Sequence, residues 1–413
     1  MKTKINFGVI GLGHRGVNLL NDVLVKFPDI KIVALCDSYR DLAEKTAKEI
    51  EKKTNYLPQA FTDYKNVLEL KNLDAILVST SWEDHIKVTC DALKKGIATA
   101  MEVGAAYDMN ELWDLVKTWE KTNTPFMFME NCCFDKHELM ATAMERDGFF
   151  GKVVHCCGAY SHDLREEISS GNIKHHYRLR NYINRNCDNY PTHEIGPIAK
   201  LLKINAGNRF KSLVSISSKA CGLHDYINKK ENKKTFKDLL NQKFKQGDVV
   251  NTIITCENGE TIEIKLDTTL PHSYDRNFIV EGTKAYYNGS THSVFLDGDK
   301  EEYFTEEWFK SENKNAEKYE QKYLPSYWKN ITNEILKSGH GGMDYFEFRY
   351  FLDCIKNNTK PSIDVYDAAT WMQISVLSEE SIKNNGAPQK FVDFTRGKWK
   401  TNKPQDLFKI KIK

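Results

Sequence analysis

The chain has 413 residues, of which 28% are charged, and a formal net charge of +2 at pH 7. Basic and acidic residues are interspersed, which argues against a nucleic-acid or membrane-surface protein. The sequence shows no apolar leader and no run of about 18 apolar residues, so we expect a cytoplasmic location. The length suits about two domains, predicted here as residues 1–131 and 132–413.

The first predicted strand leads into a glycine-rich turn, Gly11-Leu12-Gly13-His14-Arg15-Gly16, and an amphipathic helical pattern follows it. In that setting the first glycine allows the tight turn, the second lets the backbone approach a pyrophosphate, and the third lets the helix pack against its strand. The next apolar strand, 30–36, ends in Asp37, where a carboxylate holds a ribose 2′-hydroxyl and repels a 2′-phosphate. The pattern predicts a dinucleotide site that prefers NAD to NADP.

Strand and helix patterns alternate up to about residue 130, which is typical of a doubly wound parallel sheet. Further strands are expected over 73–79, 97–101 and 125–129, and helices over 39–52, 84–95 and 109–121. Two motifs follow these strands, at the edge where open α/β sheets bind ligands. In the first, Ser81 is placed to cap a helix, while Trp82 and His85 either wall a nicotinamide ribose or are ordinary helix residues.

The second motif is Glu102-Val103, in which the carboxylate is a candidate ribose ligand. No lysine follows it, which argues against a simple dehydrogenase that would use lysine as its proton donor. Glu130 and Asn131 end the last strand of this region. Glu130 is a candidate acceptor of hydrogen bonds from substrate hydroxyls, and Asn131 is a candidate hydrogen-bond partner of the nicotinamide carboxamide. Alternatively, both residues belong to a hydrogen-bond network at a domain joint.

The ten cysteines include the adjacent pairs Cys132-Cys133 and Cys156-Cys157 but no CxxC spacing. Adjacent cysteines suit neither a disulfide with each other nor tetrahedral zinc. We therefore expect small buried residues in a reduced protein, and no metal site.

After about residue 150, strand-like segments are joined by turn signals such as Glu257-Asn258-Gly259, which predict a mostly antiparallel sheet. The fold is thus predicted to be α/β, a Rossmann domain followed by an α+β domain whose C-terminal helices pack back toward the first. The polar segment 228–247 is expected to be an exposed excursion. The expected strands cover 153–160, 210–217, 249–256, 261–267, 277–281 and 285–288, and the helices 136–147, 192–203, 343–357 and 366–384.

Three motifs of the second half carry candidate chemistry. Tyr160 ends a strand, and Tyr177-Arg178-Leu179-Arg180 offers two guanidinium groups, in a segment predicted to be extended, for a polar ligand or for surface salt bridges. In Tyr190-Pro191-Thr192-His193, Thr192 is placed to cap a helix. His193 then lies in the first turn, where the helix dipole disfavours imidazolium and favours a general base.

Gly339-His340-Gly341-Gly342-Met343-Asp344 opens a late helix, either as a flexible loop or as a tight turn.

These motifs together resemble glycoside hydrolase family 109, the NAD-dependent α-N-acetylgalactosaminidase branch of the Gfo/Idh/MocA oxidoreductases. The similarity covers about residues 5–400, in order. It rests on the glycine fingerprint, Glu102-Val103, Glu130 to Cys133, Gly158 to Tyr160, Tyr190 to His193, Gly339 to Asp344, Asp364 to Ala369 and Asp393 to Gly397.

The resemblance implies roles residue by residue. Cofactor positions are His14, Arg15, Asp37, Trp82 to His85, Glu102, Val103 and Asn131, and sugar positions are Tyr160, Arg178, Tyr190 to His193 and Tyr274, with Glu130 nearby. It also implies a redox-neutral, metal-free hydrolysis. The sugar is oxidised at C3 while His193 takes the hydroxyl proton, C2 is deprotonated by Tyr160 or His193, the glycosidic oxygen is eliminated, water adds at C1 and C3 is reduced again.

The chain departs from the family pattern at Gly104, where proline is expected, and at Glu194, where a small residue is expected. Glu194 is expected to reshape the sugar pocket or to shift its charge. A small-molecule glycoside is the expected partner, and a homo-oligomer the expected assembly. A conventional NAD-dependent sugar dehydrogenase and a non-catalytic NAD-dependent sensor stay open as alternatives.

Overall fold

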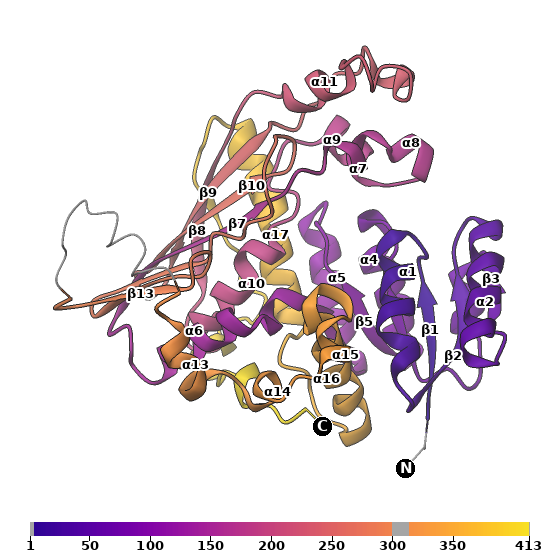
Figure 1. Cartoon of the computed structure of the whole chain (residues 1–413), viewed down its shortest axis with the longest axis horizontal. Coiled ribbons are helices and arrows are strands. Elements are labelled where there is room, and N and C mark those ends of the chain that lie inside the picture. The colour runs from indigo at the N-terminus through magenta and orange to yellow at the C-terminus, as the bar shows by residue number, and fades with distance from the viewer. Residues whose placement is uncertain (1–3, 300–313, 413) are drawn as a thin grey trace. The chain divides into compact units, whose positions relative to one another are not determined.

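The computed structural model describes residues 4–299 and 314–412 (Figure 1). The chain divides into two compact units. Of the described residues, the first unit, here the cofactor unit, comprises 4–134 and 331–369 with Ile412, and the second, the sheet unit, comprises 135–299, 314–330 and 370–411. Part of the C-terminal half therefore belongs to the first unit.

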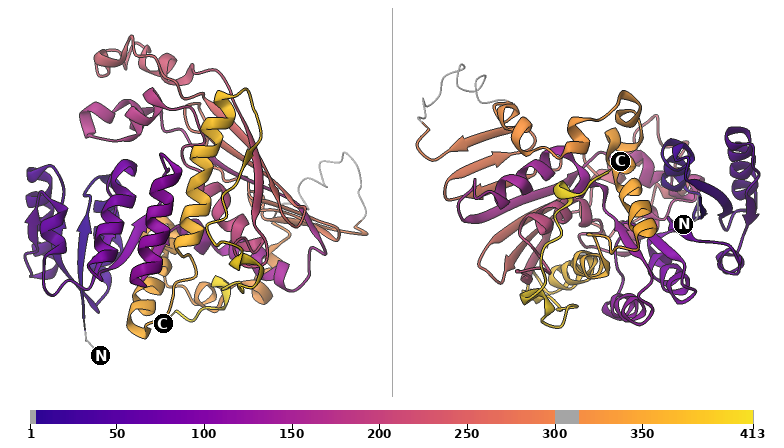
Figure 2. Two further views of the ribbon diagram at one scale, coloured as in Figure 1. Left: turned by 180° about the vertical axis from the view of Figure 1, so that it is seen from behind. Right: turned by 90° about the horizontal axis from the view of Figure 1, so that it is seen from below.

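The cofactor unit contains a six-stranded parallel sheet in the order β3-β2-β1-β4-β5-β6. Helices lie on both faces of this sheet (Figure 2), which confirms the predicted Rossmann fold. The order reverses between β1 and β4, the switch point at which such sheets bind dinucleotides. Its strands are β1 Ile5–Ile10, β2 Ile30–Cys36, β3 Gln59–Phe61, β4 Ala75–Val78, β5 Ala98–Glu102 and β6 Phe126–Met129.

The helices of the cofactor unit match the predicted ones to within three residues at each end, and short segments appear beside them. The short strand β3 and helix α3 were not predicted, because β3 spans three residues and none of them is buried. The helices are α1 His14–Asp22, α2 Arg40–Thr54, α3 Tyr64–Leu68, α4 Trp82–Lys94, α5 Met109–Thr122, α15 Asn333–Leu336 and α16 Met343–Asn357. A last helix, α17, covers Val365–Lys383 and continues into the sheet unit.

The sheet unit contains an eight-stranded sheet in the order β13-β12-β11-β7-β10-β9-β8-β14. Its strand pairs are antiparallel except β7 with β10, so the predicted mostly antiparallel sheet is confirmed. The strands are β7 Val153–Ser161, β8 Phe210–Ser217, β9 Val249–Cys256, β10 Thr261–Asp267, β11 Ile279–Gly282, β12 Ala285–Asn288, β13 Ser293–Leu296 and β14 Gln389–Lys390.

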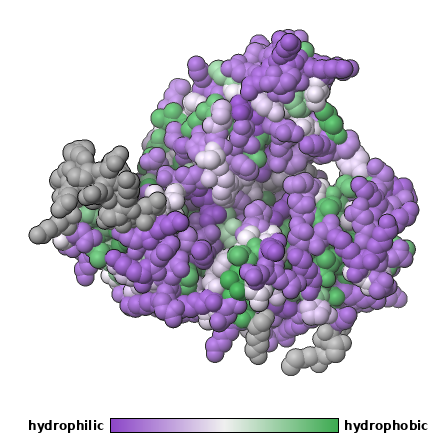
Figure 3. Space-filling model, viewed as in Figure 1, coloured by the Kyte–Doolittle hydropathy of each residue, from purple (hydrophilic) through white to green (hydrophobic). Residues whose placement is uncertain are grey.

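One face of this sheet packs against α10, Thr192–Leu201, and against α17 (Figure 1), whose Ser381 hydroxyl accepts a hydrogen bond from the N–H of Ser215 on β8. The packing is close at Gly158 of β7, where an added Cβ would lie 2.1 Å from the backbone oxygen of Glu194. The opposite, outer face carries exposed apolar side chains, among them Ile216 and Ile253. The outside of the chain is otherwise mostly hydrophilic on the side drawn in Figure 3.

The remaining helices of the sheet unit are α6 Lys136–Arg146, α7 Arg165–Ser169, α8 Gly171–Lys174, α9 Arg178–Asn184, α11 Gly222–Ile227, α13 Glu317–Tyr323 and α14 Ser326–Lys329. The predicted excursion over 228–247 consists largely of turns, but it buries Phe236 and Leu239 and is thus only partly exposed. Within residues 4–299 and 314–412, no helix combines the length and the apolar content needed to cross a membrane.

Candidate active site

The glycine-rich turn after β1 has the geometry that a bound pyrophosphate requires. Gly11 has φ +96°, and a Cβ there would lie 2.3 Å from the carbonyl oxygen of Ser79. A Cβ at Gly16 would lie 2.2 Å from the carbonyl oxygen of Gly11, whereas one at Gly13 would meet no described atom within 4 Å. Gly13 therefore leaves open space before α1, whose first turn contains no acidic residue. Backbone N–H groups and the helix dipole favour an anion at that position.

Asp37 follows β2 and is held by the backbone on both sides. Its Oδ2 accepts a hydrogen bond from the N–H of Leu12 at 2.8 Å, and its Oδ1 accepts one from Tyr39 at 3.0 Å. Each carboxylate oxygen has more than one acceptor position, so the fixed side chain can still receive a hydroxyl. The turn and the acid thus fit a dinucleotide.

A buried ion cluster joins the glycine turn to the late Gly339-to-Asp344 motif within the cofactor unit. Arg15 donates two hydrogen bonds to Asp344, at 2.7 and 3.0 Å, and its Nε donates to Glu102 at 3.1 Å. Asn131 Nδ2 donates to Asp344 Oδ1 at 2.7 Å. Burial raises the pKa of Asp344, but Arg15 and His340 outweigh it and hold that pKa well below the usual range. Two predicted cofactor residues, Arg15 and Asn131, therefore bind one carboxylate to which the sequence assigned no role, and Glu102 joins them through Arg15.

The late glycine motif is a tight turn, the second of the two predicted alternatives. His340, Gly341 and Gly342 all have positive φ, at 49°, 67° and 102°, and α16 begins directly after them. A Cβ at Gly339 would lie 2.2 Å from Asp344 Oδ2, so the glycine makes room for this carboxylate. The motif itself was the signal that could have identified Asp344.

Trp82 and His85 are buried on α4, with 1% and 3% of their surfaces exposed. A Cβ at Gly104 would lie 2.5 Å from Trp82 Cδ1 and 3.0 Å from His85 Nδ1. The absence of a side chain at Gly104, a departure from the family pattern, therefore leaves room for both rings. Val103 is also buried. Burial lowers the pKa of His85 to about 4, so its imidazole is neutral at pH 7.

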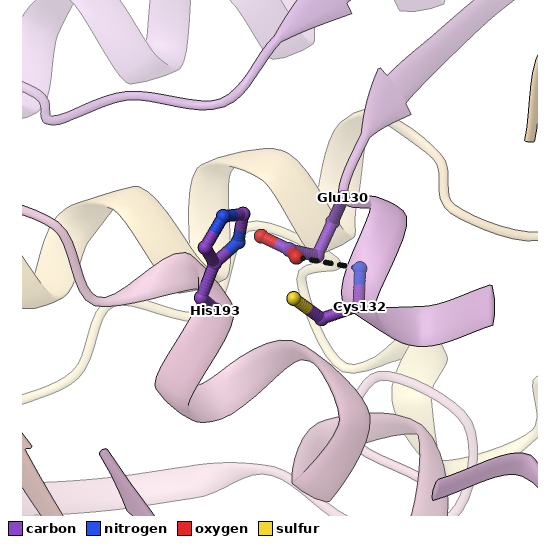
Figure 4. Close-up of side chains that lie close together, drawn as sticks. All are labelled: Glu130, Cys132 and His193. Atoms are coloured by element: carbon purple, nitrogen blue, oxygen red, sulfur yellow. Dashed lines mark hydrogen bonds between the residues drawn. The ribbon is translucent and has the colours of Figure 1, made fainter. Parts of the chain in front are cut away.

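Two further predicted residues of the cofactor unit differ in exposure. Glu130 is fully buried after β6, and its Oε1 accepts a hydrogen bond from the backbone N–H of Cys132 at 3.1 Å (Figure 4). His14 is exposed at the start of α1, where its Nε2 lies 3.2 Å from Asn18 Nδ2. Ser81 lies at the predicted cap position, but its hydroxyl donates to the Asp84 carboxylate instead of capping the backbone.

In the sheet unit, the predicted sugar residues gather around Tyr160. Its ring centroid lies 4.8 Å from that of Tyr190, 5.4 Å from that of His193 and 6.2 Å from that of Tyr274. Tyr190 Oη lies 3.4 Å from His193 Nε2, within hydrogen-bonding distance. His162, which the sequence analysis missed, completes the cluster with its ring 5.4 Å from Tyr274. The end of β7 and the first turn of α10 supply its centre.

Arg178 lies against this aromatic cluster but not in an extended segment. The prediction was wrong, because residues 178–184 form α9, whose seven residues give too short a pattern to read. The guanidinium lies over the Tyr190 ring, 4.7 Å from its centroid, and its Nε lies 2.9 Å from Glu167 Oε1. Burial lowers the pKa of Arg178, but Glu167 and the neighbouring tyrosines outweigh it, so the group stays charged.

The start of α10 corrects one predicted detail, the cap at Thr192, and contains Glu194, the second departure from the family pattern. Thr192 does not cap the helix, because it is the first helical residue and Pro191 holds the cap position. His193 lies in the first turn, as predicted. Glu194 is 1% exposed, and burial together with the Asp188 carboxylate raises its pKa well above the usual range. Burial likewise raises the pKa of Asp188 to about 7, so both carboxyl groups hold their protons to a higher pH than exposed ones do.

Comparison with known proteins identifies the family. Residues 134–401 match the model "Glycosyl hydrolase 109, C-terminal domain", and residues 5–129 match "Oxidoreductase family, NAD-binding Rossmann fold". The chain belongs to glycosyl hydrolase family 109. A family 109 protein from Stenotrophomonas maltophilia is 35% identical over 97% of this chain and 91% of its own length. An alpha-N-acetylgalactosaminidase from Tannerella forsythia is 34% identical over 97% of this chain and 88% of its own length.

Solved structures share the fold of this family 109 chain. A levoglucosan dehydrogenase in complex with NADH and L-sorbose superposes with a TM-score of 0.69 at 15% identity, covering 95% of this chain and all (100%) of its own. An apo scyllo-inositol dehydrogenase from Lactobacillus casei superposes with a TM-score of 0.65 at 14% identity, covering 94% of this chain and 99% of its own. The predicted family and fold are confirmed, and the N-terminal match supports a nicotinamide dinucleotide cofactor.

Proposed function

We propose that this family 109 protein hydrolyses α-N-acetylgalactosaminides, or closely related hexosaminides, by a redox-neutral reaction with resident NAD. The observation that carries the proposal is the cluster of Tyr160, Tyr190 and His193, which brings a candidate base and two phenols together beside the Arg178 guanidinium. The paired carboxylates of ordinary glycosidases are not needed, because the bond is broken by elimination.

The cofactor would be held by the glycine turn, with Asp37 on the adenine ribose. The fixed Asp37 carboxylate favours NAD, because it repels the 2′-phosphate of NADP. The other predicted contacts stay His14, Arg15, Trp82, His85, Glu102, Val103 and Asn131. When bound, the nicotinamide supplies a reversible hydride acceptor for C3 of the sugar.

His193 is the proposed general base at the C3 hydroxyl. Its Nε2 lies 3.4 Å from Tyr190 Oη, and this contact orients the ring. When Nε2–H donates to Tyr190, Nδ1 carries the lone pair that removes the hydroxyl proton. The ketone formed at C3 then makes the C2 proton acidic.

Tyr160 is proposed to handle the C2 proton, with His193 as the alternative. Its ring lies between Tyr190 and Tyr274, which fixes its position at the end of β7. Removal of the C2 proton places negative charge on the sugar, and breaking of the C1–O bond passes that charge to the leaving oxygen. The buried Arg178 cation lies beside these rings and would stabilise the charge. Glu130, Tyr190, Thr192 and Tyr274 remain the other proposed sugar contacts.

The reaction is tested by turnover of an aryl N-acetyl-α-galactosaminide in heavy water. We expect aglycone release without net NADH, and a product that carries deuterium at C2. A conventional sugar dehydrogenase would instead accumulate NADH in step with an oxidised sugar. A non-catalytic sensor would release no aglycone.

His193→Ala supplies the matching test of the base. Loss of a positioned general base costs about 10²–10⁴-fold in turnover, and NAD should stay bound. Glu166→Gln, on the exposed side of α7, serves as the control. Full turnover by His193→Ala would refute the assignment of the base.

We also propose that the protein forms a homo-oligomer through the outer face of its second sheet. Ile216 and Ile253 are 64% and 42% exposed on neighbouring strands there. Light scattering of the purified protein should give a multiple of the 47.7 kDa chain mass, and a monomer would contradict the proposal.

A further inference from the structure

Three strands of the second sheet bring a thiol, an imidazole and two carboxylates together on its outer face. His155 and Cys157 are two residues apart on β7, so they project to the same side. The parallel neighbour β10 places Glu263 opposite Cys157 and Thr261 opposite His155, and the antiparallel neighbour β11 places Glu281 opposite His155. Residues paired across strands share a face, so all five side chains project from one patch.

The ligand atoms of this patch have metal-site spacing. His155 Nε2 lies 3.3 Å from Cys157 Sγ, and both lie within 4.8 Å of a Glu263 carboxylate oxygen. With a zinc–sulfur distance of about 2.3 Å and a zinc–nitrogen distance of about 2.0 Å, a tetrahedral site separates the two ligand atoms by about 3.5 Å. The observed separation is thus close to that of a formed site.

His155 is also oriented as a metal-bound histidine is. Its Nδ1 lies 2.8 Å from Thr261 Oγ1. When Nδ1–H donates to this hydroxyl, the lone pair is on Nε2, the nitrogen that faces the Cys157 sulfur. A hydrogen bond to the second ring nitrogen is the usual support of a ligating histidine, because it fixes both the tautomer and the ring.

The local charges favour a cation at this place. Cys157 is half-buried, and the Glu263 and Glu281 side chains project from the two neighbouring strands of the same patch. Both carboxylates therefore place negative charge near the sulfur. A divalent cation would compensate their charge and stabilise the thiolate.

A second histidine cluster of the sheet unit, His137 with His292 and Glu320, does not meet the same geometric test. Its imidazole rings are stacked, with centroids 3.8 Å apart and planes inclined by only 14°. A metal ion lies in the plane of each imidazole that binds it, so two nearly parallel stacked rings cannot both direct a lone pair at one ion. The β7 patch contains a single ring and has no such conflict.

We propose that His155, Cys157 and Glu263 form a zinc site on the outer face of the second sheet, with Glu281 or water as the fourth ligand. Thiolate, imidazole and carboxylate together are the donor set that suits zinc. The site is separate from the proposed glycosidase chemistry. It replaces the expectation that the chain has no metal site and that Cys157 is an inert buried residue.

The test uses the full chain with reduced thiols, freed of metal by a chelator, and titrated with Co²⁺ as a spectroscopic substitute for Zn²⁺. We expect one equivalent to produce thiolate-to-cobalt charge-transfer absorption and the visible bands of tetrahedral cobalt, and Zn²⁺ to abolish both. Cys157→Ser should lose the charge-transfer band. Cys221→Ser, which alters another half-exposed thiol of this unit, should keep it.

Thr261→Val separates a built site from a chance cluster, because it keeps every ligand and removes only the support of His155. We expect cobalt to bind about 10–100-fold more weakly to this variant. Glycosidase turnover of Cys157→Ser should be unchanged, so failure of the zinc site and failure of the proposed function are distinguishable. A wild-type protein without the thiolate band, or a band that persists in Cys157→Ser, would overturn the proposal, leaving a simple S–H···N hydrogen bond.

Discussion

Asp344 is the central residue of the buried ion cluster in the cofactor unit, although the sequence assigned it no role. It receives two hydrogen bonds from Arg15 and one from Asn131, and it is fully buried. Arg15 and Asp344 are 329 residues apart in the chain, so no local pattern in the sequence could have paired them. Spacing predicted the glycine turn and drew attention to the late glycine motif, but only the fold shows that Asp344 of that motif binds Arg15.

Asp344→Asn should therefore loosen the cofactor turn. The variant leaves Arg15 with Glu102 and His340, and breaking a buried ion pair costs about 3–5 kcal/mol in the free energy of unfolding. We expect a loss of this order by urea unfolding, together with weaker NAD retention on gel filtration. Asp74→Asn, in the same unit but outside the cluster, is the matched control. Unaltered NAD retention in Asp344→Asn would show that the cluster does not position the turn.

The Asp188–Glu194 pair makes stability depend on pH in a direction opposite to that of an ordinary ion pair. The folded pKa of Asp188 is about 7, compared with about 3.9 in an unfolded chain. The folded protein therefore binds more protons between these values, and stability falls as pH rises through that window. Glu194 extends the effect upward, because its pKa is also raised.

Glu194→Gln should flatten this dependence. The amide cannot ionise, and it can donate to the Asp188 carboxylate when that group loses its proton. Relative to wild type, we expect the variant to be about 1–2 kcal/mol more stable at pH 8 and little changed at pH 5. Thermal unfolding of both proteins between pH 5 and pH 8, with saturating NAD, measures this difference in stability. An equal pH slope in both proteins would mean that Glu194 does not contribute to the pH dependence.

At the scale of elements, the buried strands were predictable and the short helices were not. The segments 30–36, 210–217, 249–256 and 261–267 are observed with the predicted bounds, because apolar runs or alternation define them. Helices α7, α8 and α9 span only four to seven residues. So few residues cover two turns or fewer, and the three helices are positioned by packing against one another and not by periodicity.

The contact of β7 with α10 is the element-level feature on which the candidate site depends, because Tyr160 lies near the end of the strand and His193 in the first turn of the helix. Gly158→Ala would place a methyl group 2.1 Å from the Glu194 backbone oxygen, so the helix must move. We expect a loss of about 1–3 kcal/mol in stability and about a 100-fold loss of kcat/KM, since a shift near 1 Å is enough to misplace a base. Val154→Ala, exposed on the same strand, is the control. Normal turnover in Gly158→Ala would separate the site from this contact.

At the scale of the whole molecule, the two units carry different parts of the proposed reaction. The glycine turn and Asp37 belong to the cofactor unit, and Tyr160, Tyr190 and His193 to the sheet unit. The fold alone does not choose between glycosidase and dehydrogenase, because the structural neighbours include sugar dehydrogenases. The two activities differ in whether NAD stays bound through turnover, and this must be measured on the complete protein.

Removal of NAD should therefore affect stability and activity together. A ligand at 100 times its Kd stabilises the folded state by about 2.7 kcal/mol, so the stripped protein should unfold at a lower temperature. Aglycone release should disappear with the cofactor and return when substoichiometric NAD is added, since each bound molecule serves many turnovers. NADP should restore neither property, because Asp37 repels the 2′-phosphate. In Asp37→Ser this repulsion is absent, so the preference for NAD over NADP should become smaller. Glycoside cleavage that persists in fully stripped protein would rule out the redox-neutral route, and a requirement for one NAD per sugar converted would identify a dehydrogenase instead.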